Sequence, residues 1–237
     1  MTFTQSEFEI RCEWGMQGVA TLAPISDVVI IIDVFSFTTC VELATAQGAT
    51  IYPYRGDDAA GFAQAVNAVL ATKWGGNGYT LSPDSLVQLP KDLRLVLPSP
   101  NGSTLSLGTG QTPTLAGCLR NYKAVAAAAL TYGERIAVIP AGERWYPDPA
   151  LRPAYEDWLG AGAIISELQG TLSPEARAAR AAFRDVEGQL ADLLGQCGSA
   201  KEHVERGHAA NLPLVAAAGV SDCVPLLIDG AYRHISP

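Results

Sequence analysis

An uninterrupted run of five β-branched residues, Val28 to Ile32, ends directly in the carboxylate of Asp33. An apolar run of this length is typical of a strand buried on both faces, as in a parallel sheet covered by helices. Open α/β sheets bind ligands at the carboxyl ends of their strands. Asp33 is therefore either a turn or helix-cap residue or an acid of a ligand site. Three hydroxyl side chains follow it and are candidate substrate contacts: Ser36, Thr38 and Thr39.

Strand-like and helix-like segments alternate along most of the chain. A loop is expected over 74–78, a capping box at Ser199 and a two-residue hairpin turn at Asp229-Gly230. The alternation predicts one α/β domain over residues 1–237. It should be a three-layer α/β/α sandwich with a mainly parallel, mixed sheet and the final hairpin at an antiparallel edge. Helices are expected over 38–47, 59–71, 122–132, 153–168 and 173–194, and strands over 28–32, 50–54, 93–97, 114–118, 135–139, 224–228 and 231–235.

Composition excludes several classes of protein. A net charge of −8 makes a nucleic acid an unsuitable partner. Five cysteines without a CxxC pair indicate reduced thiols rather than a disulfide framework or a zinc site. The first eleven residues lack the apolar core of a signal peptide, and no apolar run reaches membrane-spanning length. We therefore expect a cytoplasmic protein without a membrane partner, and the sequence leaves open whether it is a monomer or a homodimer.

Polar loops also follow three other predicted strands, those over 93–97, 114–118 and 135–139. If these strands are parallel, their carboxyl ends meet at one edge of the sheet, so the loops should gather around Asp33. Hydroxyls, backbone N–H groups and arginine side chains suit an anionic ligand. The alternatives are ordinary turn chemistry, a helix cap at Asn121 and a surface pair between Glu143 and Arg144. The candidate residues are Ser99, Asn101, Gly102, Ser103, Arg120, Asn121, Gly142, Glu143 and Arg144.

Two adjacent acids, Glu156 and Asp157, stand in the first turn of a predicted helix. Adjacent helical positions point in different directions, so one acid can reach a metal while the other faces solvent. The alternative is that both complement the helix dipole. Cys118 is a weak candidate nucleophile because no histidine stands near it in sequence. The histidines lack metal-ligand spacing and are expected at the surface: His203, His208 and His234.

With these segments laid out, the chain resembles the 2-phosphosulfolactate phosphatase (ComB) family over most of its length. The resemblance implies a magnesium-dependent phosphatase. Its substrate would be a small anionic phosphorylated 2-hydroxy acid, 2-phosphosulfolactate, converted to sulfolactate and phosphate on a route to coenzyme M. The resemblance to this family rests on segments that occur in the following order: the strand ending at Asp33 with Thr38-Thr39, Gly48-Ala49, the turn 99–103, Arg120-Asn121, the segment 141–144, Glu156-Asp157 before Gly160-Ala161-Gly162, Gly207, Gly219, Asp222-Cys223 and Pro225.

The resemblance also suggests roles for the candidate residues. Asp33 with Glu156 or Asp157 would hold Mg²⁺, Arg120 would neutralise the phosphoryl charge, and Glu143 would act as general acid. The remaining candidates would bind the substrate.

The chain departs from the family at one position. The family typically has a DVLRATT-like string after the strand, whereas Ser36 occupies the position of that arginine here. This departure favours the alternative of a binder of, or a different enzyme acting on, a small anionic metabolite. A third hypothesis is a structural or interaction protein.

Overall fold

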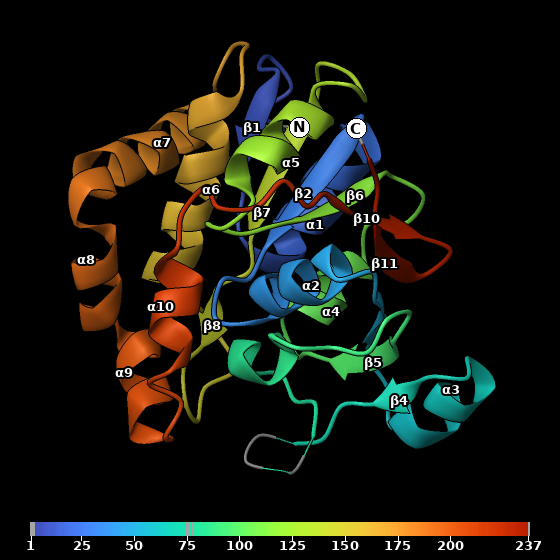
Figure 1. Cartoon of the computed structure of the whole chain (residues 1–237). Helices are drawn as coiled ribbons and strands as arrows, with labels where there is room; N and C mark the ends of the chain where they lie inside the picture. The colour runs from blue at the N-terminus through green and yellow to red at the C-terminus, as the bar shows by residue number, and fades with distance from the viewer. Residues whose placement is uncertain (1–2, 74–75, 77, 237) are drawn as a thin grey trace.

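A computed structural model describes residues 3–73, 76 and 78–236, so positions 74, 75 and 77 of the predicted loop lie outside the described residues. Among the described residues, nine strands form one mixed sheet in the order β1-β7-β2-β6-β10-β11-β3-β5-β4, with helices on both faces (Figure 1). This confirms the predicted α/β sandwich. The strands are β1 (Ile10–Cys12), β2 (Val28–Ile32), β3 (Thr50–Tyr54), β4 (Val69–Leu70), β5 (Arg94–Pro98), β6 (Thr114–Gly117), β7 (Ile136–Pro140), β10 (Pro225–Ile228) and β11 (Ala231–His234).

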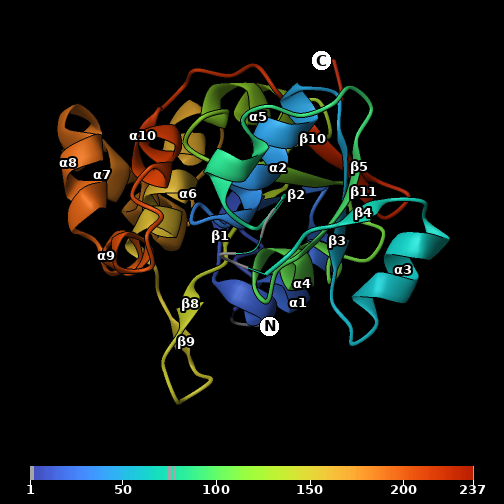
Figure 2. The same ribbon diagram turned by 60° about the horizontal axis from the view of Figure 1, so that its bottom comes forward.

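A separate antiparallel ribbon pairs β8 (Glu143–Arg144) with β9 (Leu151–Arg152) and projects from the body of the protein (Figure 2). No helix of the described part of the chain is both long enough and apolar enough to cross a membrane. The helices are α1 (Gly15–Leu22), α2 (Phe37–Ala46), α3 (Ala59–Ala65), α4 (Gly102–Ser106), α5 (Tyr122–Ala129), α6 (Tyr155–Glu167), α7 (Pro174–Val186), α8 (Leu190–Gln196), α9 (Gly198–Glu205) and α10 (Asn211–Ala216), with short 3-10 turns η1 (Ala23–Ile25), η2 (Pro83–Leu86) and η3 (Glu187–Gln189).

Strand β2 is an interior strand of the sheet, because it pairs in parallel with β7 on one side and with β6 on the other. Successive side chains of a strand point to opposite faces. Val28, Ile30 and Ile32 pack with α5, α6 and α7, whereas Val29 and Ile31 pack with α1 and α4. All five side chains are fully buried, as the continuous apolar run predicts.

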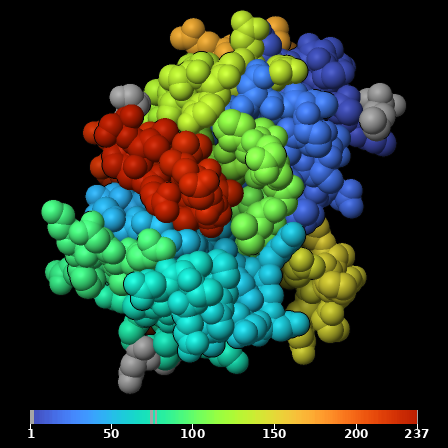
Figure 3. Space-filling view, turned by 90° about the vertical axis from the view of Figure 1, so that its right-hand side faces the viewer, coloured from blue at the N-terminus to red at the C-terminus, as the bar shows by residue number. Residues whose placement is uncertain are grey.

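The C-terminal hairpin lies inside the sheet, so its predicted place at an edge is wrong. β10 pairs antiparallel with β6, and β11 pairs antiparallel with β3. In Figure 3 the hairpin (red) lies between yellow-green and blue residues above it and cyan residues below it. Tyr232 on β11 is fully buried, and its hydroxyl donates to Ser106 Oγ at 2.8 Å. A short alternating sequence has the same pattern at an edge and in the interior, which is why the pattern alone misplaced it.

The hairpin joins two blocks of parallel strands: the first block (β1, β7, β2, β6) and the second block (β3, β5, β4). Traced through the hairpin, the second block runs opposite in sense to the first. The common direction assumed for the four strands therefore does not hold for β5. One residue pair joins β6 to β10 and one joins β11 to β3, and the second block is turned away from the first (Figures 1 and 2). This turn lets the carboxyl ends of β5 and β2 meet.

Three helix predictions require correction. The helix expected over 59–71 ends at Ala65, because Asn67 takes a left-handed φ of 49° and the chain continues into β4 beside β5. The helix expected over 173–194 is divided into α7, η3 and α8, with Gly188 at the break. The N-cap of α9 is Cys197, whose Sγ accepts from the N–H of Ala200, so the capping box at Ser199 is wrong.

Candidate active site

Asp33 lies between the end of β2 and the start of α2, and it is buried. Its Oδ1 accepts a hydrogen bond at 3.3 Å from the N–H of Phe37, the first residue of α2, although the N-cap position of α2 is Ser36. Its Oδ2 accepts from the N–H of Gly102 at 2.8 Å and from the hydroxyl of Ser99 at 3.4 Å. The acid after β2 thus joins its own loop to the loop after β5, from the other block of the sheet.

A second contact joins the loop after β5 to the loop after β7. The side-chain amide of Asn101 donates to Glu143 Oε2 at 3.0 Å. Three of the four predicted loops are therefore brought together, and they place Asp33, Ser99, Asn101 and Glu143 around one cavity.

Asp157 on α6 connects the loop after β2 to the loop after β7. Its Oδ1 accepts from the N–H of Val34 at 2.7 Å, and its Oδ2 accepts from the N–H of Gly142 at 2.8 Å. The side chain is buried and does not line the cavity beside Asp33. Both carboxylate oxygens of Asp157, a predicted metal ligand, thus accept hydrogen bonds from backbone N–H groups. These contacts hold the two loops in position.

Replacing Asp157 by asparagine is expected to lower stability by about 1–2 kcal/mol. The amide has one acceptor oxygen, so one of the two buried N–H groups loses its partner. This loss of stability lies in the lower part of the range for an unpaired buried polar group, because asparagine, unlike aspartate, buries no charge. Thermal unfolding of Asp157→Asn, compared with Asp185→Asn at an exposed position of α7, measures the effect. Equal melting temperatures for the two variants would contradict the positioning role.

The cavity beside Asp33, here named the acidic chamber, has a volume of about 350 Å³. Its wall opposite the three loops comes from α9 and the residue that follows it. Four polar residues of this segment share one helical face at the spacing i, i+3, i+4, i+7. The lining residues are Asp33, Phe35, Ser36, Leu81, Ser99, Pro100, Asn101, Glu143, Ser199, Glu202, His203 and Arg206.

The contribution of α9 was missed by sequence reasoning. His203 was expected at the surface, but it is buried with its ring centroid 4.8 Å from that of Phe35. Burial lowers the pKa of His203 to about 4, with smaller contributions from His208 and Arg206, so the ring is neutral at pH 7. Arg206 forms an ion pair with Glu202 at the same wall. The helical spacing of these residues was the available signal, but no motif connects them to Asp33.

Burial and mutual repulsion raise the pKa values of the acids at this site. Burial raises the pKa of Asp33 to about 6, and the charge of Glu156 adds to the effect. Burial, followed by the charges of Asp33 and Glu156, raises the pKa of Glu143 to about 7. The pKa of Asp157 is raised well above its usual range by burial and by the charges of Glu156 and Asp33. The site therefore concentrates negative charge that a cation would offset.

Several predicted site residues serve the loops rather than line the chamber. The hydroxyl of Thr38 donates to the carbonyl oxygen of Asp33, that of Thr39 to Val34, and that of Ser103 to Leu97. These bonds brace the loop backbone. Ser36, in contrast, lines the chamber, and its hydroxyl donates to the carbonyl oxygen of Leu81 at 2.8 Å.

The loop after β6 is not brought to the chamber. Arg120 Nε donates to Glu42 Oε2 on α2 at 2.6 Å, and its guanidinium also donates to the carbonyl oxygen of Leu214. Asn121 precedes α5 but makes no side-chain cap. Its amide instead accepts from the N–H of Cys118 and donates to the carbonyl oxygens of Ala116 and Cys223.

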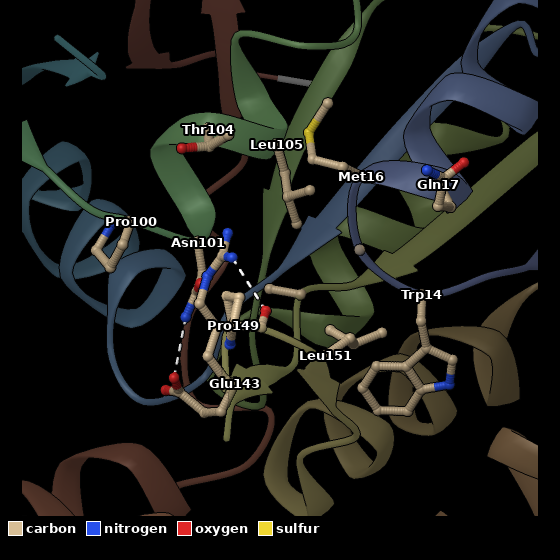
Figure 4. A pocket seen from close by; sticks show the side chains of 13 residues that line it. Trp14, Met16, Gln17, Pro100, Asn101, Thr104, Leu105, Glu143, Pro149 and Leu151 are labelled. Atoms are coloured by element: carbon tan, nitrogen blue, oxygen red, sulfur yellow. Dashed lines mark hydrogen bonds between the residues drawn. The ribbon is translucent and has the colours of Figure 1, made fainter. Parts of the chain in front are cut away.

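A second cavity of about 330 Å³, here named the Trp14 chamber, adjoins the acidic chamber (Figure 4). The two share Pro100, Asn101 and Glu143, so the Asn101–Glu143 hydrogen bond lies in the wall between them. Predicted substrate contact Arg144 lines the Trp14 chamber and donates to the carbonyl oxygen of Pro149 at 3.3 Å. The lining residues are Trp14, Gly15, Met16, Gln17, Pro100, Asn101, Thr104, Leu105, Ala141, Glu143, Arg144, Pro149 and Leu151.

The donor set of the acidic chamber fits Mg²⁺. This ion prefers oxygen ligands and is commonly held by one or two carboxylates together with waters and substrate phosphates. Within the described residues, no three His, Cys, Asp or Glu side chains are arranged to hold a metal on their own. Asp33 and Glu143 line the chamber together, whereas Glu156 and Asp157 do not. Glu156 is buried nearby, with its Oε2 3.5 Å from Cys197 Sγ.

Comparison with known proteins places the chain in a family. The family model described as 2-phosphosulpholactate phosphatase matches residues 19–230. A protein of Pseudothermotoga lettingae named "Probable 2-phosphosulfolactate phosphatase" is 24% identical over 216 residues, covering 89% of this chain and 93% of its own length. The 2-phosphosulfolactate phosphatase of Methanothermobacter thermautotrophicus is 30% identical over 136 residues, 57% of each chain. The chain therefore belongs to the 2-phosphosulpholactate phosphatase family of phosphoric monoester hydrolases.

Proposed function

We propose that this protein hydrolyses the phosphoric monoester of a small 2-hydroxy acid, with 2-phosphosulfolactate as the reference substrate, and that it requires Mg²⁺. The observation that carries the proposal is the acidic chamber of a phosphatase-family chain, built where three strand-end loops meet. The chamber combines carboxylates, hydroxyls and an arginine, which are the groups that hold a metal and a phosphoryl group.

The residues of the chamber suggest where the phosphoryl group binds. Ser36, Ser99 and Asn101 line this space. The hydroxyls of Ser36 and Ser99 donate to Leu81 and Asp33, whereas the amide of Asn101 has a second N–H besides the one directed at Glu143. Arg206 supplies a positive charge at the opposite wall, which suits a phosphoryl oxygen. In this assignment Arg206 has the role that was predicted for Arg120. Both guanidinium groups form ion pairs, Arg120 with Glu42 and Arg206 with Glu202, and of the two it is Arg206 that lines the chamber.

The acids divide the remaining tasks. Bound Mg²⁺ would act as a Lewis acid that offsets charge on the phosphoryl oxygens. Asp33 would hold the ion, and the bonds from Gly102 and Ser99 fix the direction of its carboxylate. Glu143, whose pKa is raised to about 7, carries a proton on a substantial fraction of molecules at neutral pH. It would donate that proton to the oxygen of the leaving alcohol.

Phosphate release from 2-phosphosulfolactate and related phosphorylated 2-hydroxy acids tests the proposal. Release is expected with Mg²⁺ and is expected to stop in EDTA and to return when Mg²⁺ is restored. Hydrolysis that is unaffected by EDTA would show that the reaction does not require Mg²⁺. An absence of hydrolysis for every ester would overturn the phosphatase assignment.

Metal-free protein is expected to lose stability as pH rises from about 5 to 8. The folded-state pKa values of Asp33 and Glu143, about 6 and about 7, lie above the ordinary carboxyl values. A raised carboxyl pKa stabilises the fold below the ordinary value, and this contribution disappears as pH rises through the folded-state value. Each kcal/mol shifts the melting temperature of a chain of this size by roughly 2–4 °C.

Addition of Mg²⁺ should restore the melting temperature at pH 8 and have little effect at pH 5, where the acids are protonated. Thermal unfolding at both pH values, with Mg²⁺ or EDTA, gives the comparison. An equal change in melting temperature on addition of Mg²⁺ at pH 5 and pH 8 would show that Asp33 and Glu143 do not bind the metal.

A further inference from the structure

The Trp14 chamber contains a positive charge that forms no ion pair within the described part of the chain. Arg144 lines the chamber from the β8–β9 ribbon, and its side chain is exposed. Its guanidinium donates to the carbonyl oxygen of Pro149 at 3.3 Å, which is a neutral acceptor. Arg120 and Arg206, in contrast, are each paired with a glutamate. The charge of Arg144 is therefore available to an anion in the Trp14 chamber.

A hydroxyl on α4 lines the same chamber. Asn101 and Thr104 are three positions apart at the start of α4, so they lie on the same side of the helix, and Figure 4 shows Thr104 above Asn101. Asn101 lines both chambers, whereas Thr104 lines the Trp14 chamber. The Thr104 hydroxyl has no hydrogen-bond partner among the described residues, whereas that of Ser103 donates to Leu97. Helix α4 thus carries polar side chains from the shared wall into the Trp14 chamber.

The acidic chamber does not suit a third anionic group of the substrate. Asp33 and Glu143 line it, and Arg206, the one arginine among its described lining residues, is paired with Glu202. In 2-phosphosulfolactate the carboxylate is bonded directly to carbon 2, which carries the phosphate ester, so the carboxylate stays beside the phosphoryl group. The sulfonate is carried by carbon 3 and reaches one bond farther. The sulfonate therefore needs a cation outside the acidic chamber, and Arg144 lines the adjoining one.

We propose that the Trp14 chamber binds the sulfonate of the substrate, and that Arg144 and Thr104 determine the specificity for this group. The guanidinium donates charged hydrogen bonds to the sulfonate oxygens, and the Thr104 hydroxyl donates one more. Because Arg144 is exposed, the bound sulfonate keeps part of its water, which lowers the cost of binding a charged group. This inference rests on the proposed function for its chemistry and on the wall shared by the two chambers for its geometry.

The first test removes one charge from the protein and one from the substrate. Arg144→Met is expected to raise KM for 2-phosphosulfolactate about tenfold, the lower end for a hydrogen bond to a charged group. The kcat should change little, because the sulfonate is bound equally in the ground state and the transition state. The KM for 2-phospholactate, which has hydrogen in place of the sulfonate, should change far less. Arg184→Met removes the same charge from an exposed position of α7 outside both chambers and should alter neither KM. An equal rise in KM for both esters in Arg144→Met would overturn the proposal.

Two conservative variants separate sulfonate binding from packing. Arg144→Lys keeps the positive charge and should recover part of the affinity for 2-phosphosulfolactate that Arg144→Met loses. Thr104→Val keeps the shape of the side chain without its hydroxyl, so KM should rise several-fold for 2-phosphosulfolactate and stay near wild type for 2-phospholactate. A Thr104→Val protein with the same loss for both esters would contradict a role of this hydroxyl in specificity.

A binding measurement separates this inference from the phosphatase assignment. In calorimetry without phosphate or metal, sulfolactate is expected to bind the wild-type protein more tightly than lactate, and this difference should disappear in Arg144→Met. If no ester is hydrolysed, the proposed function fails and this measurement alone decides the subsite: a preference for sulfolactate that depends on Arg144 supports it, and equal binding of the two acids overturns it. If the esters are hydrolysed but the sulfonate affects neither KM nor binding, the phosphatase assignment stands and the sulfonate subsite is wrong.

Discussion

Asp33→Asn is expected to lower kcat by roughly 10³-fold, which corresponds to about 4 kcal/mol of transition-state stabilisation at 1.36 kcal/mol per factor of ten. The substitution removes the charge that would hold the metal, which contributes several kcal/mol in metal-assisted phosphoryl transfer. The fold should persist, because the amide oxygen still accepts one of the backbone N–H groups of Phe37 and Gly102.

The matched control is Asp27→Asn, at the opposite end of the same strand, where the carboxylate pairs with Arg135 at the surface. Steady-state kinetics with Mg²⁺ and thermal unfolding should be measured for both variants. Wild-type kcat in a folded Asp33→Asn protein would limit Asp33 to holding two loops together, and it would contradict the proposed mechanism.

Gly102→Ala is expected to reduce both stability and activity. An added Cβ would lie 2.7 Å from Asp33 Oδ2 and still closer to the ring of Phe37, and both of these neighbours are buried. Overpacking of this kind costs about 1–3 kcal/mol, and we expect the upper part of that range because neither neighbour has room to move. Displacement of the Asp33 carboxylate would reduce kcat at the same time.

Gly188→Ala serves as the control, since no atom lies within 4 Å of its added Cβ. Melting temperatures and kcat should fall together for Gly102→Ala and stay near wild type for Gly188→Ala. A Gly102→Ala protein that keeps its melting temperature would show that the loops after β2 and β5 are not held as closely as described.

Much of the fold was predictable because it depends on local patterns. The run Val28–Ile32 predicts a strand covered on both faces. The helix expected over 38–47 is α2, and Gly48 directly after that range takes a left-handed φ of 85°. The hairpin turn at Asp229-Gly230 is also correct. The alanine-rich segment 59–71 was misread because helix propensity is a weak signal, and pairing with β5 decides its second half.

The candidate site was less predictable because its contacts join residues far apart in the chain. The partner of Arg120 is Glu42, 78 positions away, and nothing local to Arg120 shows that its charge is already engaged. His203 and Arg206 reach the chamber only because α9 folds against the loops after β2 and β5. Asp33 was found because it stands at a strand end, which is a property of the local sequence. The catalytic and binding roles stay predictions.

The interior position of the C-terminal hairpin has a consequence for biosynthesis. The strands that join the two blocks, β10 and β11, leave the ribosome after every other strand of the sheet. Until they arrive, β6 and β3 each present an unpaired edge, which is a template for pairing with another chain. A nascent or prematurely terminated chain that lacks Pro225–His234 therefore has the residues of the acidic chamber but no sheet to hold the two blocks together, and it should be a substrate for chaperones and proteases.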